Sequence, residues 1–171
     1  MLWRFDPKEV KSIDLRNAAA GDIVCPLRSA APPVLWLRLA GDEHTQPILH
    51  LSGPNLLKVW QVQSQQNLPT LLIAKGASLQ LEVAGQRGVA PREGRPGELV
   101  FTDDAAYFVA LLDSRGFPEE CYISLADWSI NAPHQVTPMN ASFSAWRLVQ
   151  TRSLGEREVL FSTGDWSNLA F

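Results

Sequence analysis

The spacing of hydrophobic residues changes once along the chain, near Gly21. Before that glycine, apolar residues recur at three- and four-residue intervals, as at Val10 and Ile13. Asp6 has the side chain of a helix cap and is followed at once by proline, which suits a first helical turn. The pattern therefore predicts a short N-terminal helix over residues 7–19, and the glycine would end it.

After this point the pattern is that of β-structure. Short segments rich in strand-forming residues alternate with turn sequences, which is typical of β-hairpins. The expected strands are 34–39 with 48–52 as a first hairpin, 57–62, and 71–74 with 78–83 as a second hairpin. In the last segment, Leu79, Leu81 and Val83 share one face and the polar residues between them face water.

Two segments of the C-terminal half, 107–129 and 145–167, form a weak internal repeat. Their ends match at five of ten positions, and each contains the sequence Asp-Trp-Ser after an apolar stretch. We interpret each segment as a hairpin that ends in an Asp-Trp-Ser corner. This favours a strand for the apolar stretch at 103–112, although eight apolar residues in a row fit a buried helix as well.

Residues 85–97 interrupt the apolar pattern with four glycines, two prolines and three arginines. We expect a mobile loop here, between two halves of one domain over residues 1–171. Arg87, Arg92 and Arg95 would bind an anionic ligand or an acidic partner in one interpretation. In the other, they are the charges of an ordinary solvated loop.

The expected architecture is therefore mainly β. It is a single-domain antiparallel β-sandwich or barrel built from successive hairpins, with a short N-terminal helix. An α+β fold with an additional helix near 103–112 is the alternative.

Composition narrows the class of protein. The chain has 171 residues, 46% of them apolar, and its 15 basic and 18 acidic residues give a net charge of −3. An apolar fraction this high excludes intrinsic disorder, and the small negative charge argues against a nucleic-acid binder held by phosphate contacts. No apolar run approaches the roughly 20 residues of a membrane helix. We expect a soluble protein without membrane or nucleic-acid partners.

The chain has two cysteines, Cys25 and Cys121. Neither has a second cysteine or a histidine at the two- to four-residue spacing of zinc ligands, so no metal site is expected. Two free thiols fit a reducing compartment, which predicts a cytoplasmic location. The low lysine content beside many alanines, leucines and arginines is typical of bacterial proteins.

The most distinctive polar–aromatic pairs are Asp127-Trp128 and Asp165-Trp166. As ligand-binding residues, the tryptophans would stack on a ring while the carboxylates accept hydrogen bonds. As structural residues, the aspartates would bond the backbone two positions on, and the indoles would cover the end of the core.

No catalytic or cofactor motif is present, so we expect neither a cofactor nor an assignable catalytic residue. The sequence favours a non-catalytic binding or protein-interaction domain of bacterial type, whose partner is a small molecule or a protein. The alternative is a small enzyme with a dispersed site, in which His50 or His134 works with a carboxylate. A homo-oligomeric structural protein is a third reading, since the sequence leaves the oligomeric state open.

Overall fold

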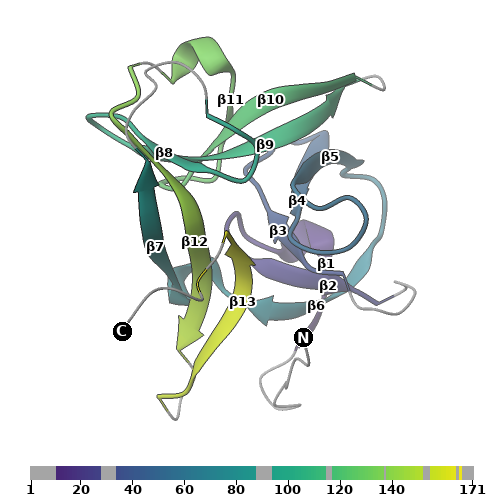
Figure 1. Cartoon of the computed structure of the whole chain (residues 1–171). Coiled ribbons are helices and arrows are strands. Elements are labelled where there is room, and N and C mark those ends of the chain that lie inside the picture. Colours follow the sequence, from purple (N-terminus) through teal and green to yellow (C-terminus); the bar gives the residue numbers. More distant parts are fainter. Residues whose placement is uncertain are drawn as a thin grey trace. The chain divides into compact units, whose positions relative to one another are not determined.

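Figure 1 shows the computed structural model, which describes residues 11–27, 34–87, 94–114, 117–136, 138–151, 155–164 and 166. Thirteen β-strands and three short 3-10 turns make up this part, so the prediction of a mainly β protein is confirmed. The elements are β1 (Lys11–Asp14), η1 (Leu15–Asn17), β2 (Ile23–Pro26), β3 (Trp36–Arg38), β4 (Thr45–His50), β5 (Lys58–Gln63), β6 (Pro69–Ala74), η2 (Gly76–Ser78), β7 (Leu79–Arg87), β8 (Leu99–Phe101), β9 (Ala106–Ser114), β10 (Phe117–Ser124), β11 (Ile130–Asn131), η3 (Pro133–Gln135), β12 (Ala141–Thr151) and β13 (Arg157–Thr163). None of the helical turns described approaches the length or apolar character of a membrane-spanning helix.

The chain divides into two compact units, Met1–Ala77 and Ser78–Phe171. A single domain over residues 1–171 stays a prediction. The expected loop at 85–97 lies within the second unit. Its first three residues belong to β7, residues 88–93 lie outside the described part, and the described remainder forms a turn before β8.

The first unit contains one antiparallel sheet with the strand order β1-β6-β2-β3-β4-β5. Strands β3 and β4 form the first predicted hairpin, in which Trp36 is paired with His50. Strand β6 comes last in sequence but lies between β1 and β2. A buried cluster on this sheet joins residues from η1, β2, β4 and β5, namely Leu15, Ala18, Val24, Ile48 and Val62.

The predicted N-terminal helix is wrong over its described part, and residues 7–10 lie outside that part. Lys11–Asp14 forms β1 and pairs with β6. The Asp14 carboxylate accepts a hydrogen bond from the backbone N–H of Arg16 at 2.9 Å, which caps a single 3-10 turn and not a longer helix. The helical spacing is a weak local preference, and pairing with a distant strand overrides it.

The second unit is built on the long strand β12. Strand β7 pairs along one side of β12, as Figure 1 shows, while β8 and β13 pair with it on the other side. Strands β9, β10 and β11 continue the sheet from β8. The second predicted hairpin, 71–74 with 78–83, is therefore wrong in its pairing: β6 pairs within the first unit, and β7 pairs with β12.

The ambiguous stretch at 103–112 contributes residues 106–112 to strand β9, so the strand that we favoured is confirmed and the alternative of a helix there is wrong. Both segments of the predicted repeat are hairpins, β9–β10 and β12–β13. Buried residues of β8, β9, β10 and the segment after η3 form a core cluster, namely Val100, Val109, Tyr122, Val136 and Met139. That the two hairpins are copies of one repeat stays a prediction.

Candidate functional site

The first unit holds a pocket of about 270 Å³ at one end of the β3–β4 hairpin. Its described wall combines two prolines and two aliphatic residues with two aromatic rings and one amide. The lining residues are Pro26, Val34, Trp36, His50, Pro54, Asn55 and Leu68. Because β3 and β4 pair with Trp36 opposite His50, the hairpin itself brings the two rings to the same place.

His50 is the most deeply buried polar residue of this wall, with 4% of its surface exposed. Its imidazole lies edge-on between two indoles, with ring centroids 5.6 Å from Trp36 and 4.5 Å from Trp60. Burial, with a smaller contribution from the positive charge of Lys58, lowers the pKa of His50 from 6.5 to about 4. The imidazole is therefore neutral at physiological pH.

Two nitrogen atoms of these wall residues lack a hydrogen-bond partner among the described residues. They are Nε1 of Trp36 and Nε2 of His50, and both are buried. A buried polar atom without a partner costs about 1–3 kcal/mol, and most such atoms in native proteins are satisfied.

The segment that contributes Pro54 and Asn55 is held in place by several backbone hydrogen bonds. The backbone N–H of Leu35 donates to Oγ of Ser52 at 2.8 Å, and that of Leu57 donates to the His50 carbonyl at 2.9 Å. Leu57 has a φ of 66°, in the left-handed region that is unfavourable for a residue with a side chain. The rim is thus tied to the strand that carries the histidine.

His50 is the ionisable side chain among the described residues of the pocket wall. No carboxylate, lysine or arginine is among the described lining residues. The described residues contain no group of three or more histidine, cysteine or acidic side chains suited to a metal ion. The other two histidines, His44 and His134, are exposed in turns.

The first Asp-Trp-Ser corner has the geometry expected of a turn. Oδ1 of Asp127 accepts hydrogen bonds from the backbone N–H of Ser129 at 3.1 Å and from its hydroxyl at 2.7 Å. These bonds lower the pKa of the Asp127 carboxyl. Trp128, the half-buried residue between Asp127 and Ser129, has a φ of 63°. The carboxylate is thereby engaged by its own turn.

The second corner is described only at its tryptophan, because Asp165 lies outside the described residues. Nε1 of Trp166 donates to the carbonyl of Thr163 at 2.9 Å, and the guanidinium of Arg147 lies 4.3 Å from the ring centre. Arg147 also bonds Glu82 at 2.5 Å. Trp166 thus packs against an ion pair of its own sheet.

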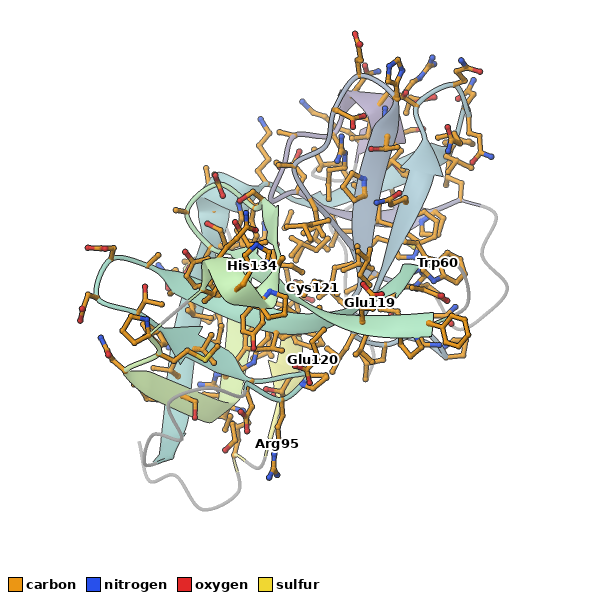
Figure 2. All side chains as sticks on the ribbon, turned by 90° about the horizontal axis from the view of Figure 1, so that it is seen from above. Trp60, Arg95, Glu119, Glu120, Cys121 and His134 are labelled. Atoms are coloured by element: carbon orange, nitrogen blue, oxygen red, sulfur yellow. The ribbon has the colours of Figure 1, made fainter. Side chains whose placement is uncertain are left out.

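The three candidate arginines are not described as one site. Arg92 lies outside the described residues, and Arg87 ends β7 without a described side chain. Arg95 is exposed and extends away from the ribbon in Figure 2, while its backbone N–H donates to the Glu98 carboxylate at 3.1 Å. An anion-binding role for the three arginines stays a prediction.

Two further reactive groups of the second unit are unsuited to catalysis. Glu119 and Glu120 lie on opposite sides of β10, as Figure 2 shows, so these adjacent carboxylates do not converge. Burial raises the pKa of the Cys121 thiol to about 12, which keeps it protonated.

Sequence reasoning missed the pocket, although it placed both of its ring residues on the strands of one hairpin. The alternation of apolar and polar residues around His50 is typical of a strand with one exposed face, whereas β4 is buried on both faces from Gln46 onward. The register of the hairpin, which pairs Trp36 with His50, was the available signal. Asn55, Pro54 and Leu68 reach the pocket through tertiary contacts that leave no local pattern.

Comparison with known proteins adds no functional assignment: no family model, curated protein or solved structure matches the chain.

Proposed function

We propose that the protein is a non-catalytic binding domain whose first unit takes up a small, mainly apolar molecule. The observation that carries this proposal is the pocket itself. Its described wall is largely apolar and includes the rings of Trp36 and His50. Apolar walls with a few convergent polar atoms are typical of small-molecule sites.

Binding is favoured over catalysis by what surrounds the histidine. A histidine that acts as a general base is usually oriented by a carboxylate, and the part of the wall that the structure describes includes none. The enzyme alternative, in which His50 works with a carboxylate, has no supporting contact here. His134, the other histidine of that alternative, is exposed in η3.

We further propose a cytoplasmic, bacterial-type protein without nucleic-acid or membrane partners. Both cysteines are free thiols and buried, which supports a reducing compartment. The net charge of −3 supports the expectation that nucleic acid is not a partner. Cell fractionation with an antibody against the protein would test the location.

Titration with naphthalene, followed by tryptophan fluorescence and by calorimetry, tests the binding proposal. Naphthalene is neutral and apolar and matches the wall in chemical character. The variant N55W places a large ring at the pocket rim and is expected to weaken binding at least tenfold. The matched control is L56W, since the neighbouring Leu56 is exposed and does not line the pocket.

Saturable binding of naphthalene that N55W weakens and L56W leaves within about twofold would support the proposal. Absence of saturable binding to the wild-type protein, or equal losses in the two variants, would overturn it.

A further inference from the structure

We infer that the first unit binds an acidic, proline-rich segment of a partner protein, with one proline in the pocket and the proline three residues away against the exposed indole of Trp60. The inference goes beyond the proposed function, because the apolar group in the pocket then belongs to a protein chain. It follows from a row of three rings on neighbouring strands, from the spacing of that row, and from the charge of Lys58 beside it.

The three rings come from β3, β4 and β5, which are neighbours in the sheet. Trp36 and His50 line the pocket, and the imidazole also contacts the indole of Trp60, with 4.5 Å between ring centroids. Trp60 is 40% exposed and is not among the described lining residues. A ligand confined to the pocket would leave this indole uncovered, whereas a longer ligand would contact it as well.

The spacing of the row fits a polyproline II chain. The centroid of His50 is 5.6 Å from that of Trp36 and 4.5 Å from that of Trp60, so the two indoles are separated by at most the total of these distances, about 10 Å. Strands β3 and β5 flank β4, and two strand spacings of about 4.8 Å give nearly the same value. In polyproline II, residues three positions apart lie about 9 Å apart on one side of the chain.

Proline suits both ends of this row. A cavity of about 150 Å³ is large enough for benzene, so the pocket, at about 270 Å³, has room for a prolyl ring. A polyproline II chain is preformed and loses little conformational entropy on binding, and aromatic-lined grooves are its usual binding sites. Trp36 in the pocket wall and Trp60 outside it provide two such aromatic surfaces.

Lys58 sets the charge of the segment. The register of β4 and β5 pairs Leu49 with Val59, which brings Lys58, the first residue of β5, next to His50. Its positive charge contributes to the lowered pKa of His50, as expected of an ammonium group close to the row. A carboxylate between the two prolines would be attracted to Lys58, and a basic residue there would be repelled. Charge complementarity therefore favours an acidic segment.

Two capped peptides of equal composition test the spacing. A-P-E-A-P-A has its prolines three residues apart, and A-P-E-P-A-A has them two residues apart. At pH 7.5 and low salt, we expect isothermal titration calorimetry to show about fivefold tighter binding of the first peptide, because only its prolines match the row. Nuclear Overhauser effects between its prolyl protons and the ring protons of Trp60 provide a measurement that requires no variant to fold.

The variant W60A removes the indole outside the pocket. We expect it to weaken binding of A-P-E-A-P-A about fivefold and to leave naphthalene binding within about twofold, since Trp60 is not among the described lining residues. The matched control is Q61A. Gln61 is also exposed on β5, but as the next residue of the strand it faces the opposite side, so neither ligand should be affected.

A third peptide, A-P-Q-A-P-A, tests the charge. We expect K58Q to weaken binding of the glutamate peptide about threefold and to leave that of the glutamine peptide unchanged. Equal effects of K58Q on the two peptides would overturn the requirement for an acidic segment.

Equal binding of the two peptides that differ in spacing, absence of contacts to Trp60, or equal effects of W60A and Q61A would overturn the inference. Saturable binding of naphthalene without binding of A-P-E-A-P-A would also overturn it and would leave the proposed function intact. Failure of naphthalene to bind would instead overturn the proposed function.

Discussion

The imidazole of His50 lies edge-on to the indole of Trp60, with 4.5 Å between ring centroids and an angle of 64° between ring planes. A second indole, that of Trp36, contacts the histidine at 5.6 Å. Edge-to-face contacts of this kind stabilise aromatic pairs beyond the area they bury. They also remove water from the imidazole, so the charged form of His50 is disfavoured in the folded protein.

This burial predicts that stability falls in mild acid. The pKa of His50 is about 4 in the folded protein, whereas an unburied histidine has the ordinary value of 6.5. The unfolded chain therefore binds the proton first, and stability is lost as the pH falls from about 6.5 to about 4. The difference of pKa corresponds to about 3 kcal/mol. Urea unfolding at a series of pH values measures this loss.

Two variants assign the acid sensitivity to one histidine. H50F should remove most of the pH dependence between 6.5 and 4, because a phenyl ring does not titrate. H44Q removes an exposed imidazole from the turn before β4 and serves as the control. A pH dependence that persists in H50F and disappears in H44Q would show that His44 causes the acid sensitivity, and it would contradict the prediction for His50.

Gly164 should not tolerate a side chain. A Cβ there would approach Cβ of Ala145 to 2.6 Å and the carbonyl oxygen of Ser144 to 2.7 Å, and its φ is +72°. We expect G164A to lower the free energy of unfolding by about 3 kcal/mol, from overpacking together with the left-handed backbone. Chemical denaturation measures the loss.

Gly155 provides the matched control for this substitution. It has nearly the same φ, +77°, but none of the described residues comes within 4 Å of an added Cβ. G155A should therefore cost only the backbone term, about 1 kcal/mol. If the two variants lost equal stability, the close approach at Ala145 would have no energetic weight.

The Asp127 carboxylate should stabilise its corner through its two bonds to Ser129. D127A removes both and should cost about 1 kcal/mol, whereas D127N retains an acceptor oxygen and should cost less. D104A, which removes another exposed carboxylate, controls for the change in net charge. Thermal unfolding distinguishes the variants, and a ligand role would instead require D127A to leave stability unchanged.

Trp146 should be the most sensitive aromatic residue of the second unit. Its ring is 2% exposed and packs against Phe108 and Phe161, with centroids 4.8 and 5.0 Å away. Its Nε1 donates to the Gly97 carbonyl at 2.8 Å. W146F keeps the packing but leaves that carbonyl without its donor, so we expect a loss of about 2 kcal/mol in urea unfolding.

The half-buried Trp128 supplies the control for Trp146. W128F should change stability by less than about 1 kcal/mol, because its indole is only partly removed from water. A larger loss in W128F than in W146F would contradict this ranking of the two indoles.

The sequence was informative where period-2 patterns met turn residues. It located β3, β4, β5 and the strand that begins at Leu79, since each shows strand-forming residues bounded by turns. It was uninformative about partners, because alternation along one strand says nothing about which strand lies beside it. The segment 78–83 was therefore identified as a strand but assigned to the wrong neighbour.

The candidate site was beyond sequence reasoning for a related reason. A histidine between apolar residues on a strand looks polar and exposed, whereas the structure places His50 between two indoles with 4% of its surface exposed. The corner at Asp127 could be predicted, because the hydrogen bond between an aspartate and the backbone two residues on is a local interaction. Local turn interactions were predictable from the sequence. The pocket was not, because five separate segments form it.

The position of β6 in the first unit has a consequence for synthesis of the chain. Residues Pro69–Ala74 are the last strand of this unit to leave the ribosome, yet they lie between β1 and β2. Until they emerge, the facing edges of β1 and β2 have no neighbour, and open edges invite pairing with other nascent chains. The unit can therefore close its sheet only after its final strand is made, which ties its folding to the end of its own translation.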